Sequence, residues 1–157
     1  TYNGTEQESR YSFTMNSNGL PGSITNLDEA IEQLSLIASG EEMEELLAYP
    51  RSEREEKLIE FWVRVFPTSE GDINGKMREY YRRINFVNQQ YGSGNEGWRT
   101  DRGRVYLVYG RPTDIEKHVF VDQQAPTEIW YYSHLGKQFV FRDENGFGDF
   151  RLVSPFW

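Results

Sequence analysis

Apolar residues recur at helical spacing through the first two thirds of the chain. The clearest stretch carries them every three to four positions, at Leu27, Ala30, Ile31, Leu34 and Ile37. Such a stripe predicts an amphipathic helix. Thr25 or Asn26 can cap its start, Asp28 and Glu29 suit its first turn, and we expect Gly40 to end it.

Three further helices are predicted downstream. A short acidic helix covers about 41–49 and ends at Pro50, with Glu41, Glu42, Glu44 and Glu45 forming a solvated face. Ser52 and Glu55 have the spacing of a capping box, which predicts a third helix that stops before Pro67. The fourth is expected to start after a cap at Asn74, with these residues on one face: Met77, Tyr80, Tyr81, Ile84, Asn88 and Tyr91.

The hydrophobic period then changes to two, which is typical of strands. Four strands are predicted, at Arg104–Tyr109, Glu128–Ser133, Lys137–Arg142 and Asp149–Val153. Asp143 to Gly146 carries the strongest hairpin signal in the chain. Helices first and strands afterwards indicate an α+β fold, with three to four N-terminal helices packed on one face of a four-stranded antiparallel meander sheet.

Residues 1–23 form a polar, turn-rich segment ahead of the main domain at 24–157. Within the segment, Tyr11, Phe13 and Met15 alternate with polar residues, as in a short strand. A single strand is not stable alone. It therefore joins the edge of the main sheet or is the remnant of an upstream β-rich domain, and we favour the second interpretation.

Composition and charge narrow the function classes. The chain has 157 residues, suited to one domain, and aromatic residues make up 15% of it. Its formal net charge of −8 argues against nucleic-acid binding, which depends on clustered Lys and Arg. It contains no Cys, so disulfides and thiolate chemistry are excluded. No apolar run approaches the ~20 residues of a membrane helix, so we expect no direct membrane insertion.

Gly97-Trp98-Arg99-Thr100-Asp101 spells the motif of the GWxTD domain family, and the chain resembles that family from about Leu27 to Val153. Phe61-Trp62, Glu79 to Arg83, Tyr109 to Pro112 and Ile129 to Tyr132 extend the match. The resemblance implies a bacterial protein that is periplasmic or otherwise exported, in which a domain of unassigned function follows a β-rich region. The sheet half also resembles, more weakly, the small lipoproteins of outer-membrane protein assembly (the BamE/SmpA type), which are non-enzymatic scaffolds.

The motif allows two interpretations. In the structural one, which we favour, Gly97 adopts a restricted conformation and Trp98 fills the core between helix and sheet. Thr100 then helps to satisfy the backbone of the loop, and Asp101 hydrogen-bonds either that backbone or an Arg. In the functional one, three arginines form an anion-binding patch that Asp101 orients, since the Arg fork matches carboxylate and phosphate. Those arginines are Arg99, Arg102 and Arg104.

Consecutive aromatic residues on one predicted strand suggest a second candidate site. Trp130, Tyr131 and Tyr132 must place large rings on both sheet faces. One face is core, and the other, with Phe139 or Phe141 across from it, is a candidate surface for partner contact. The alternative is that the N-terminal segment or a neighbouring domain covers this face.

No catalytic set accompanies these features. His118 and His134 lack zinc-binding spacing, and no nucleophile elbow or thiol is present. We therefore expect no metal and no cofactor. The sequence predicts a non-enzymatic binding or structural module of an exported multi-domain protein, with a protein partner or neighbouring domain. The rival is a small-ligand or anion-binding domain, or an enzyme, with its site at the GWRTDRG loop. A connecting domain without any site is a third possibility.

Overall fold

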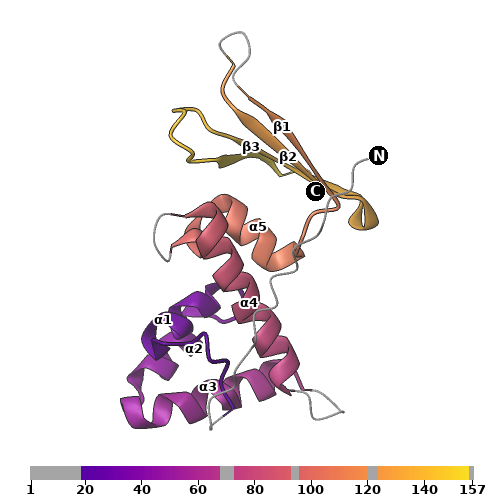
Figure 1. The fold of residues 1–157 in the computed structure, drawn as a ribbon. Helices are drawn as coiled ribbons and strands as arrows, with labels where there is room; N and C mark the ends of the chain where they lie inside the picture. The colour runs from indigo at the N-terminus through magenta and orange to yellow at the C-terminus, as the bar shows by residue number, and fades with distance from the viewer. Residues whose placement is uncertain (1–18, 68–72, 93–95, 120–123, 156–157) are drawn as a thin grey trace.

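The computed structural model describes residues 19–67, 73–92, 96–119 and 124–155. Their fold is α+β with a four-stranded antiparallel sheet, as predicted. A helical body lies at one end of the molecule and the sheet at the other (Figure 1). The expected strand at Tyr11 to Met15 lies outside the described residues.

The helical body contains four α-helices and a 3-10 turn. They are α1 (Leu27–Glu32), η1 (Gln33–Leu36), α2 (Gly40–Ala48), α3 (Arg51–Val65) and α4 (Ile73–Tyr91). As one of the two predicted alternatives, Asn26 caps α1 through its side chain, which accepts from the backbone N–H groups of Asp28 and Glu29.

Several predicted helix boundaries were wrong. Gly40 does not end the first helix but begins α2, because Ser39 and Glu42 form a reciprocal capping box there. Ser52 and Glu55 form no such box, since α3 already begins at Arg51 after Pro50. The α4 helix includes Ile73, so Asn74 lies inside it rather than capping it.

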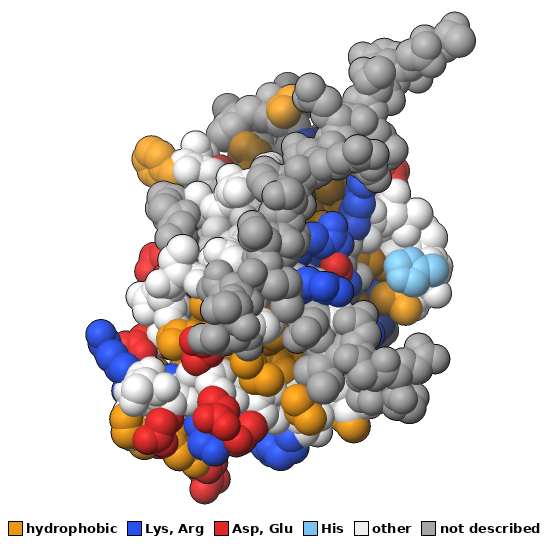
Figure 2. All heavy atoms as spheres, turned by 60° about the horizontal axis from the view of Figure 1, so that its bottom comes forward, with side chains coloured by type: hydrophobic (Ala, Val, Ile, Leu, Met, Phe, Trp, Pro, Cys, Tyr) orange, Lys and Arg blue, Asp and Glu red, His pale blue; other side chains and the backbone are white. Residues whose placement is uncertain are grey.

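One hydrophobic cluster, the helical core, unites these helices around Trp62. This ring is 1% exposed and contacts Phe66, Tyr80 and Tyr81. The two buried tyrosines donate hydrogen bonds to backbone carbonyls at the other side of the core, Tyr80 to Gln33 and Tyr81 to Ala30. The acidic face of α2 is solvated as predicted. Figure 2 shows acidic side chains over this end of the molecule, interspersed with basic and hydrophobic ones.

The predicted strand at Arg104–Tyr109 is a helix, α5 (Asp101–Tyr109). Its alternating pattern has a physical cause, because α5 lies between two hydrophobic clusters. Leu107 belongs to the helical core, whereas Val105 belongs to a second cluster under the sheet. Residues two apart lie on nearly opposite sides of a helix, so a helix buried on both sides reproduces the period of a strand.

The sheet has the order β1-β2-β3-β4. Its strands are β1 (Asp114–His118), β2 (Thr127–Tyr132), β3 (Lys137–Arg142) and β4 (Arg151–Pro155). The meander prediction is confirmed, as are the bounds of β3 and the turn at Asp143, which accepts from the N–H groups of Gly146 and Gly148. The prediction missed β1 because all five of its residues are exposed, so it carries no hydrophobic alternation.

The second cluster, the sheet core, fills the space between α5 and the inner face of the sheet. Its buried members are Val105, Trp130, Tyr132, Phe139 and Phe141. Tyr91, at the end of α4, packs against it as well. The helical cover of the sheet is thus α5 with the last turn of α4, while α1 to α3 pack around the helical core (Figure 1).

Candidate functional site

Two glycines let the GWRTDRG segment fold tightly against α4. The 3-10 turn η2 (Gly97–Arg99) lies so close to α4 that a Cβ on Gly97 would come within 1.9 Å of the Val87 carbonyl oxygen. A Cβ on Gly103 would come within 2.0 Å of the Gly97 carbonyl oxygen. Contacts that short are sterically impossible, so both positions require glycine for space rather than for a special φ angle.

Trp98 fills the helical core and not the helix–sheet boundary, which corrects the sequence-based expectation. Its ring is 6% exposed, and its backbone N–H donates to Asn88 Oδ1 on α4 at 3.0 Å. The guanidinium of Arg99 lies over the ring, 4.2 Å from its centroid, and forms an ion pair with Glu32 at 3.1 Å. Trp98 therefore joins η2 to the helical body.

Thr100 and Asp101 organise the start of α5. The Thr100 hydroxyl accepts from the Gly103 N–H at 3.0 Å and donates to the Gly97 carbonyl at 2.7 Å, so this residue is the N-cap. Asp101 Oδ2 accepts from the backbone N–H of Leu152 in β4 at 2.8 Å. The carboxylate thus ties the helix to the last strand and also lies favourably at the positive end of the helix dipole.

Arg102 points into the sheet core, where it meets a carboxylate that the sequence analysis did not identify. Its Nη1 lies 3.4 Å from Glu128 Oε1, and only 7% of Glu128 is exposed. Trp130 Nε1 donates to the other oxygen of Glu128 at 3.1 Å. Period two on β2 places Glu128 on the same face as Trp130 and Tyr132, and this was the available signal.

Aromatic rings enclose the guanidinium of Arg102. Its centre lies 4.2 Å from the Phe150 ring centroid and 5.0 Å from that of Tyr91, and Nη2 donates to the Gly148 carbonyl at 3.3 Å. Burial raises the pKa of the Tyr91 hydroxyl to about 12, although the Arg102 charge acts to lower it. The site is therefore a charge pair in a largely aromatic shell, built from α4, α5 and the sheet.

The three arginines of the predicted anion-binding patch have different surroundings. Arg99 pairs with Glu32, and Arg102 pairs with Glu128. Arg104 is exposed, and its side chain has no hydrogen bond or ion pair with any residue that the structure describes. Asp101 bonds to β4 and contacts none of them through a hydrogen bond or ion pair in the described part of the chain. The anion-binding patch stays a prediction.

The aromatic residues of β2 divide between the two faces of the sheet as expected. Trp130 and Tyr132 are fully buried on the inner face, and Tyr131 lies on the outer face, where its hydroxyl donates to Glu116 Oε2 at 2.9 Å. Phe139 and Phe141, expected opposite Tyr131 on the outer face, are buried in the sheet core instead. They occupy the inner side because they pair in register with Trp130 and Glu128.

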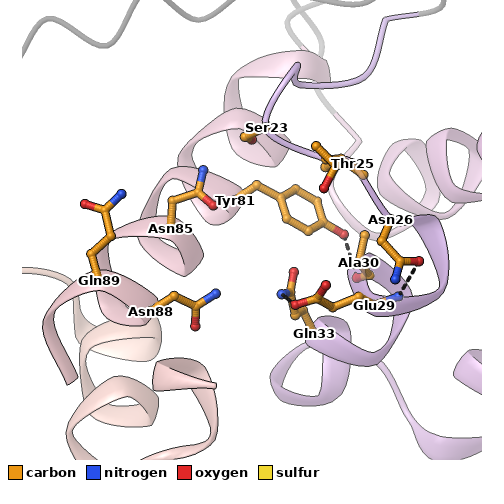
Figure 3. Close-up of a pocket in the computed structure, with 11 residues that line it drawn as sticks. Ser23, Thr25, Asn26, Glu29, Ala30, Gln33, Tyr81, Asn85, Asn88 and Gln89 are labelled. Carbon is orange, nitrogen blue, oxygen red and sulfur yellow. Dashed lines mark hydrogen bonds between the residues drawn. The ribbon is translucent and has the colours of Figure 1, made fainter. Parts of the chain in front are cut away.

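A cavity of about 170 Å³ lies beside the motif, between the α1 region and α4 (Figure 3). No residue of the 97–104 segment lines it. Asn88 connects the two features, because its Oδ1 accepts from Trp98 while the side chain also forms part of the cavity wall. Five carboxamide side chains line the cavity: Asn26, Gln33, Asn85, Asn88 and Gln89. These five residues belong to no known sequence motif, so the sequence analysis did not identify them.

Two further properties concern only the described residues. No group of three or more His, Asp or Glu side chains among them is placed to hold a metal ion. Within the same ranges, no helix combines the length and the apolar character needed to cross a bilayer.

Comparison with known proteins gives one match. The family model described as GWxTD domain matches residues 1–150. No curated protein and no solved structure matches the chain, so the weaker likeness of the sheet half to assembly lipoproteins stays a prediction.

Proposed function

This chain belongs to the GWxTD domain family, and we propose that it is a non-enzymatic binding or structural module that contacts a protein partner or a neighbouring domain. The module acts through the outer face of its sheet. The GWRTDRG segment holds the helical body and the sheet together, and it has no catalytic part.

The proposal is supported by the hydrogen bonds and ion pairs that the motif's polar groups form within the chain. Asp101 bonds to Leu152, Arg102 pairs with Glu128, and Thr100 bonds to both Gly97 and Gly103. A catalytic or anion-binding group must instead direct its polar atoms towards a ligand. To bind an anion, Arg102 would have to leave a carboxylate that is nearly inaccessible to water, which is unfavourable because the carboxylate would remain buried without its partner.

The outer face of the sheet is the surface that we assign to partner contact. All α-helices of the described residues lie on the other side of the sheet (Figure 1). Tyr131 on β2 lies there beside Ile129, with Val140 opposite Ile129 on β3, and all three are partly exposed. An aromatic ring among aliphatic neighbours is typical of the centre of protein interfaces.

Site-specific photo-crosslinking tests the proposal. The photo-crosslinking residue p-benzoyl-L-phenylalanine replaces Tyr131 in the full-length protein, which is produced in its own cells. The matched control carries the same residue in place of Val63, an exposed apolar residue on α3 and not on the sheet. We expect a crosslink from position 131 alone. A crosslink to a second protein identifies a partner, and one within the chain identifies a neighbouring domain. Equal yields at both positions, or none at 131, contradict the proposal.

The proposed setting is an exported, periplasmic multi-domain protein. This part of the proposal comes from the family resemblance alone. Fractionation of cells that make the full-length protein is expected to place it outside the cytoplasm, and recovery in the cytoplasmic fraction would overturn it.

An anion-binding domain or enzyme centred on Arg99, Asp101 and Arg102 is the rival function. Exposed Arg104, with no ion pair among the described residues, favours it. Inorganic phosphate discriminates between the two functions. Saturable binding that Arg104→Gln abolishes would support the rival, whereas no binding is expected from a binding module of the proposed kind.

A further inference from the structure

The cavity between the α1 region and α4 is walled by neutral polar side chains from two sides. Asn85 and Asn88 project from α4 towards Glu29 and Gln33 on the other side, and Tyr81 lies between them (Figure 3). Pockets for drug-sized ligands are typically ~300–1,000 Å³. A cavity of about 170 Å³ therefore fits a smaller ligand, on the scale of a single ring.

Hydrogen-bonding capacity inside the cavity is only partly used. Gln33, 7% exposed, donates through Nε2 to Glu29 at 3.3 Å, and no residue of the described chain bonds its Oε1. Asn88, 9% exposed, accepts through Oδ1 from Trp98, and its Nδ2 has no described partner. The hydroxyl of Ser23 is buried without a hydrogen bond to any described residue. Buried polar groups are normally paired. The Ser23 hydroxyl therefore lacks an expected partner, and the Oε1 of Gln33 and the Nδ2 of Asn88 are available to bond a ligand.

The motif determines which end of Asn88 faces the cavity. The N–H of Trp98 needs an acceptor and takes Oδ1, which leaves the Nδ2 donor for the cavity. Gln33 is fixed in the opposite sense, because its Nε2 is held by Glu29 and its acceptor oxygen remains. The wall therefore offers a donor from one side and an acceptor from the other.

The charges on the wall restrict the class of ligand. Among the described residues that line the cavity, Glu29 is the only charged one, and none is Lys or Arg. A phosphate or carboxylate ligand would meet a carboxylate with no cation to balance it. An extended peptide is also a poor fit, because the lining belongs to helices and a loop and offers no strand edge for main-chain pairing.

We propose that this cavity binds a small neutral polyol of the size of one sugar ring. Each hydroxyl of such a ligand both donates and accepts, which matches carboxamides that expose one donor and one acceptor. Asn85 and Asn88 donate to ligand oxygens, Gln33 accepts from a hydroxyl, and Glu29 accepts from another through its free oxygen. The site is separate from the outer face of the sheet, so either can fail without the other.

Titration followed by ¹H–¹⁵N NMR tests the proposal on the full chain. The probes are methyl β-D-glucopyranoside, methyl β-D-galactopyranoside and myo-inositol, each raised to about 50 mM, with inorganic phosphate as the anionic probe. We expect saturable shifts of the side-chain NH₂ signals of Asn85 and Asn88 with at least one polyol and none with phosphate.

Asn85→Leu and Glu29→Gln are the variants of choice, because Asn88 also supports Trp98 and its loss could unfold the chain. Loss of one hydrogen bond to the ligand is expected to weaken binding about tenfold. Gln90→Leu, an exposed residue of α4 outside the lining, is the matched control and should bind as the wild type does. The proposal is overturned if no polyol gives saturable shifts, if phosphate binds, or if Asn85→Leu and Gln90→Leu bind equally well.

Discussion

The two hydrophobic cores both contain buried tryptophans, Trp62 and Trp98 in the helical core and Trp130 in the sheet core, yet they satisfy their polar groups differently. In the helical core, Tyr80 and Tyr81 surround Trp62, and both hydroxyls donate to backbone carbonyls. In the sheet core, Tyr132 also donates to a backbone carbonyl, that of Gly110, but Trp130 donates to Glu128, which pairs with Arg102. The helical core thus depends on neutral bonds to a backbone that α1 and η1 already fix. The sheet core depends on a charge pair whose members come from different elements.

This difference bears on how the two cores respond to damage. A tyrosine that loses its hydroxyl leaves one backbone carbonyl without that hydrogen bond. An arginine that loses its charge leaves a carboxylate buried without its counter-ion, which lowers the free energy of unfolding by more than the loss of the tyrosine hydroxyl does. We therefore expect the attachment of the sheet to be more sensitive to single polar substitutions than the helical body.

The largest effect is expected where both cores are alike. Trp62→Ala and Trp130→Ala should each lower the free energy of unfolding by ~3–5 kcal/mol, because both rings are almost wholly buried and their removal leaves cavities. Urea unfolding measures the loss, with Phe147→Ala at a 90% exposed position as the control. A loss below ~1 kcal/mol at Trp130 alone would show that the sheet core is loosely packed.

The charge pair should be the next most sensitive element. Arg102→Met is expected to destabilise the fold by about 3 kcal/mol, since Glu128 would keep only the exposed Lys117, at 3.5 Å, as a counter-ion. The double variant Arg102→Met/Glu128→Leu should recover much of this loss because it removes both charges together. Additive losses in urea unfolding of the double variant would mean that the two side chains act independently.

Asp101→Ala should cost ~1–3 kcal/mol, because the N–H of Leu152 loses its acceptor and the start of α5 loses a favourable charge. Asp101→Asn keeps an acceptor oxygen and is expected to recover most of the stability. If Asp101→Ala is instead neutral or more stable than the wild type, the carboxylate is retained for another purpose, and the rival site at the motif gains support.

The helical core offers the matching neutral substitution. Tyr81→Phe removes the hydrogen bond to the Ala30 carbonyl, 2.9 Å long, and keeps the ring in place. We expect a loss of ~1 kcal/mol in thermal or urea unfolding, clearly smaller than that of Arg102→Met. Losses of equal size in the two variants would remove the distinction between the cores.

The smallest effect concerns pH. The Ser39 backbone N–H, followed by the Arg64 guanidinium, holds the pKa of Glu42 below its usual value of 4.5. A carboxyl group whose pKa is lower in the folded than in the unfolded state stabilises the fold at pH values above its unfolded-state pKa. This contribution is lost as the pH falls through the folded-state pKa. Glu42→Gln should therefore flatten the loss of stability below about pH 4.5, measured by thermal unfolding against pH. Parallel curves for variant and wild type would argue against this role.

The sequence revealed the elements whose neighbours lie on one side only. α4 and β3 have a single buried face each, so their periodicity was clear. α5 was mistaken for a strand because it is buried against two cores, and β1 was missed because none of its residues is buried. Both errors have one cause, since hydrophobic periodicity reports the number of buried faces as well as the type of element.

The sequence indicated which residues form the candidate site at the motif, but not which residues they bond to. Glycine, threonine and aspartate in a short segment indicated a constrained junction, and that interpretation agrees with the geometry of Gly97 and Thr100. The acceptor of Arg102 and the donor to Asp101 come from distant strands, which no local pattern names. The carboxamide cavity was missed for the same reason, because its walls are joined only by folding.

The bond from Asp101 to Leu152 joins residues 51 positions apart, and it sets an order of events on the ribosome. Helix α5 and its partners in the helical body are synthesised before the sheet. Asp101 accepts its hydrogen bond from β4, which follows the other three strands of the sheet in the chain. Until that strand leaves the exit tunnel, the sheet lacks an edge and the carboxylate is hydrated. In the nascent chain, the side of α5 that later packs against the sheet is therefore exposed to solvent until the sheet forms.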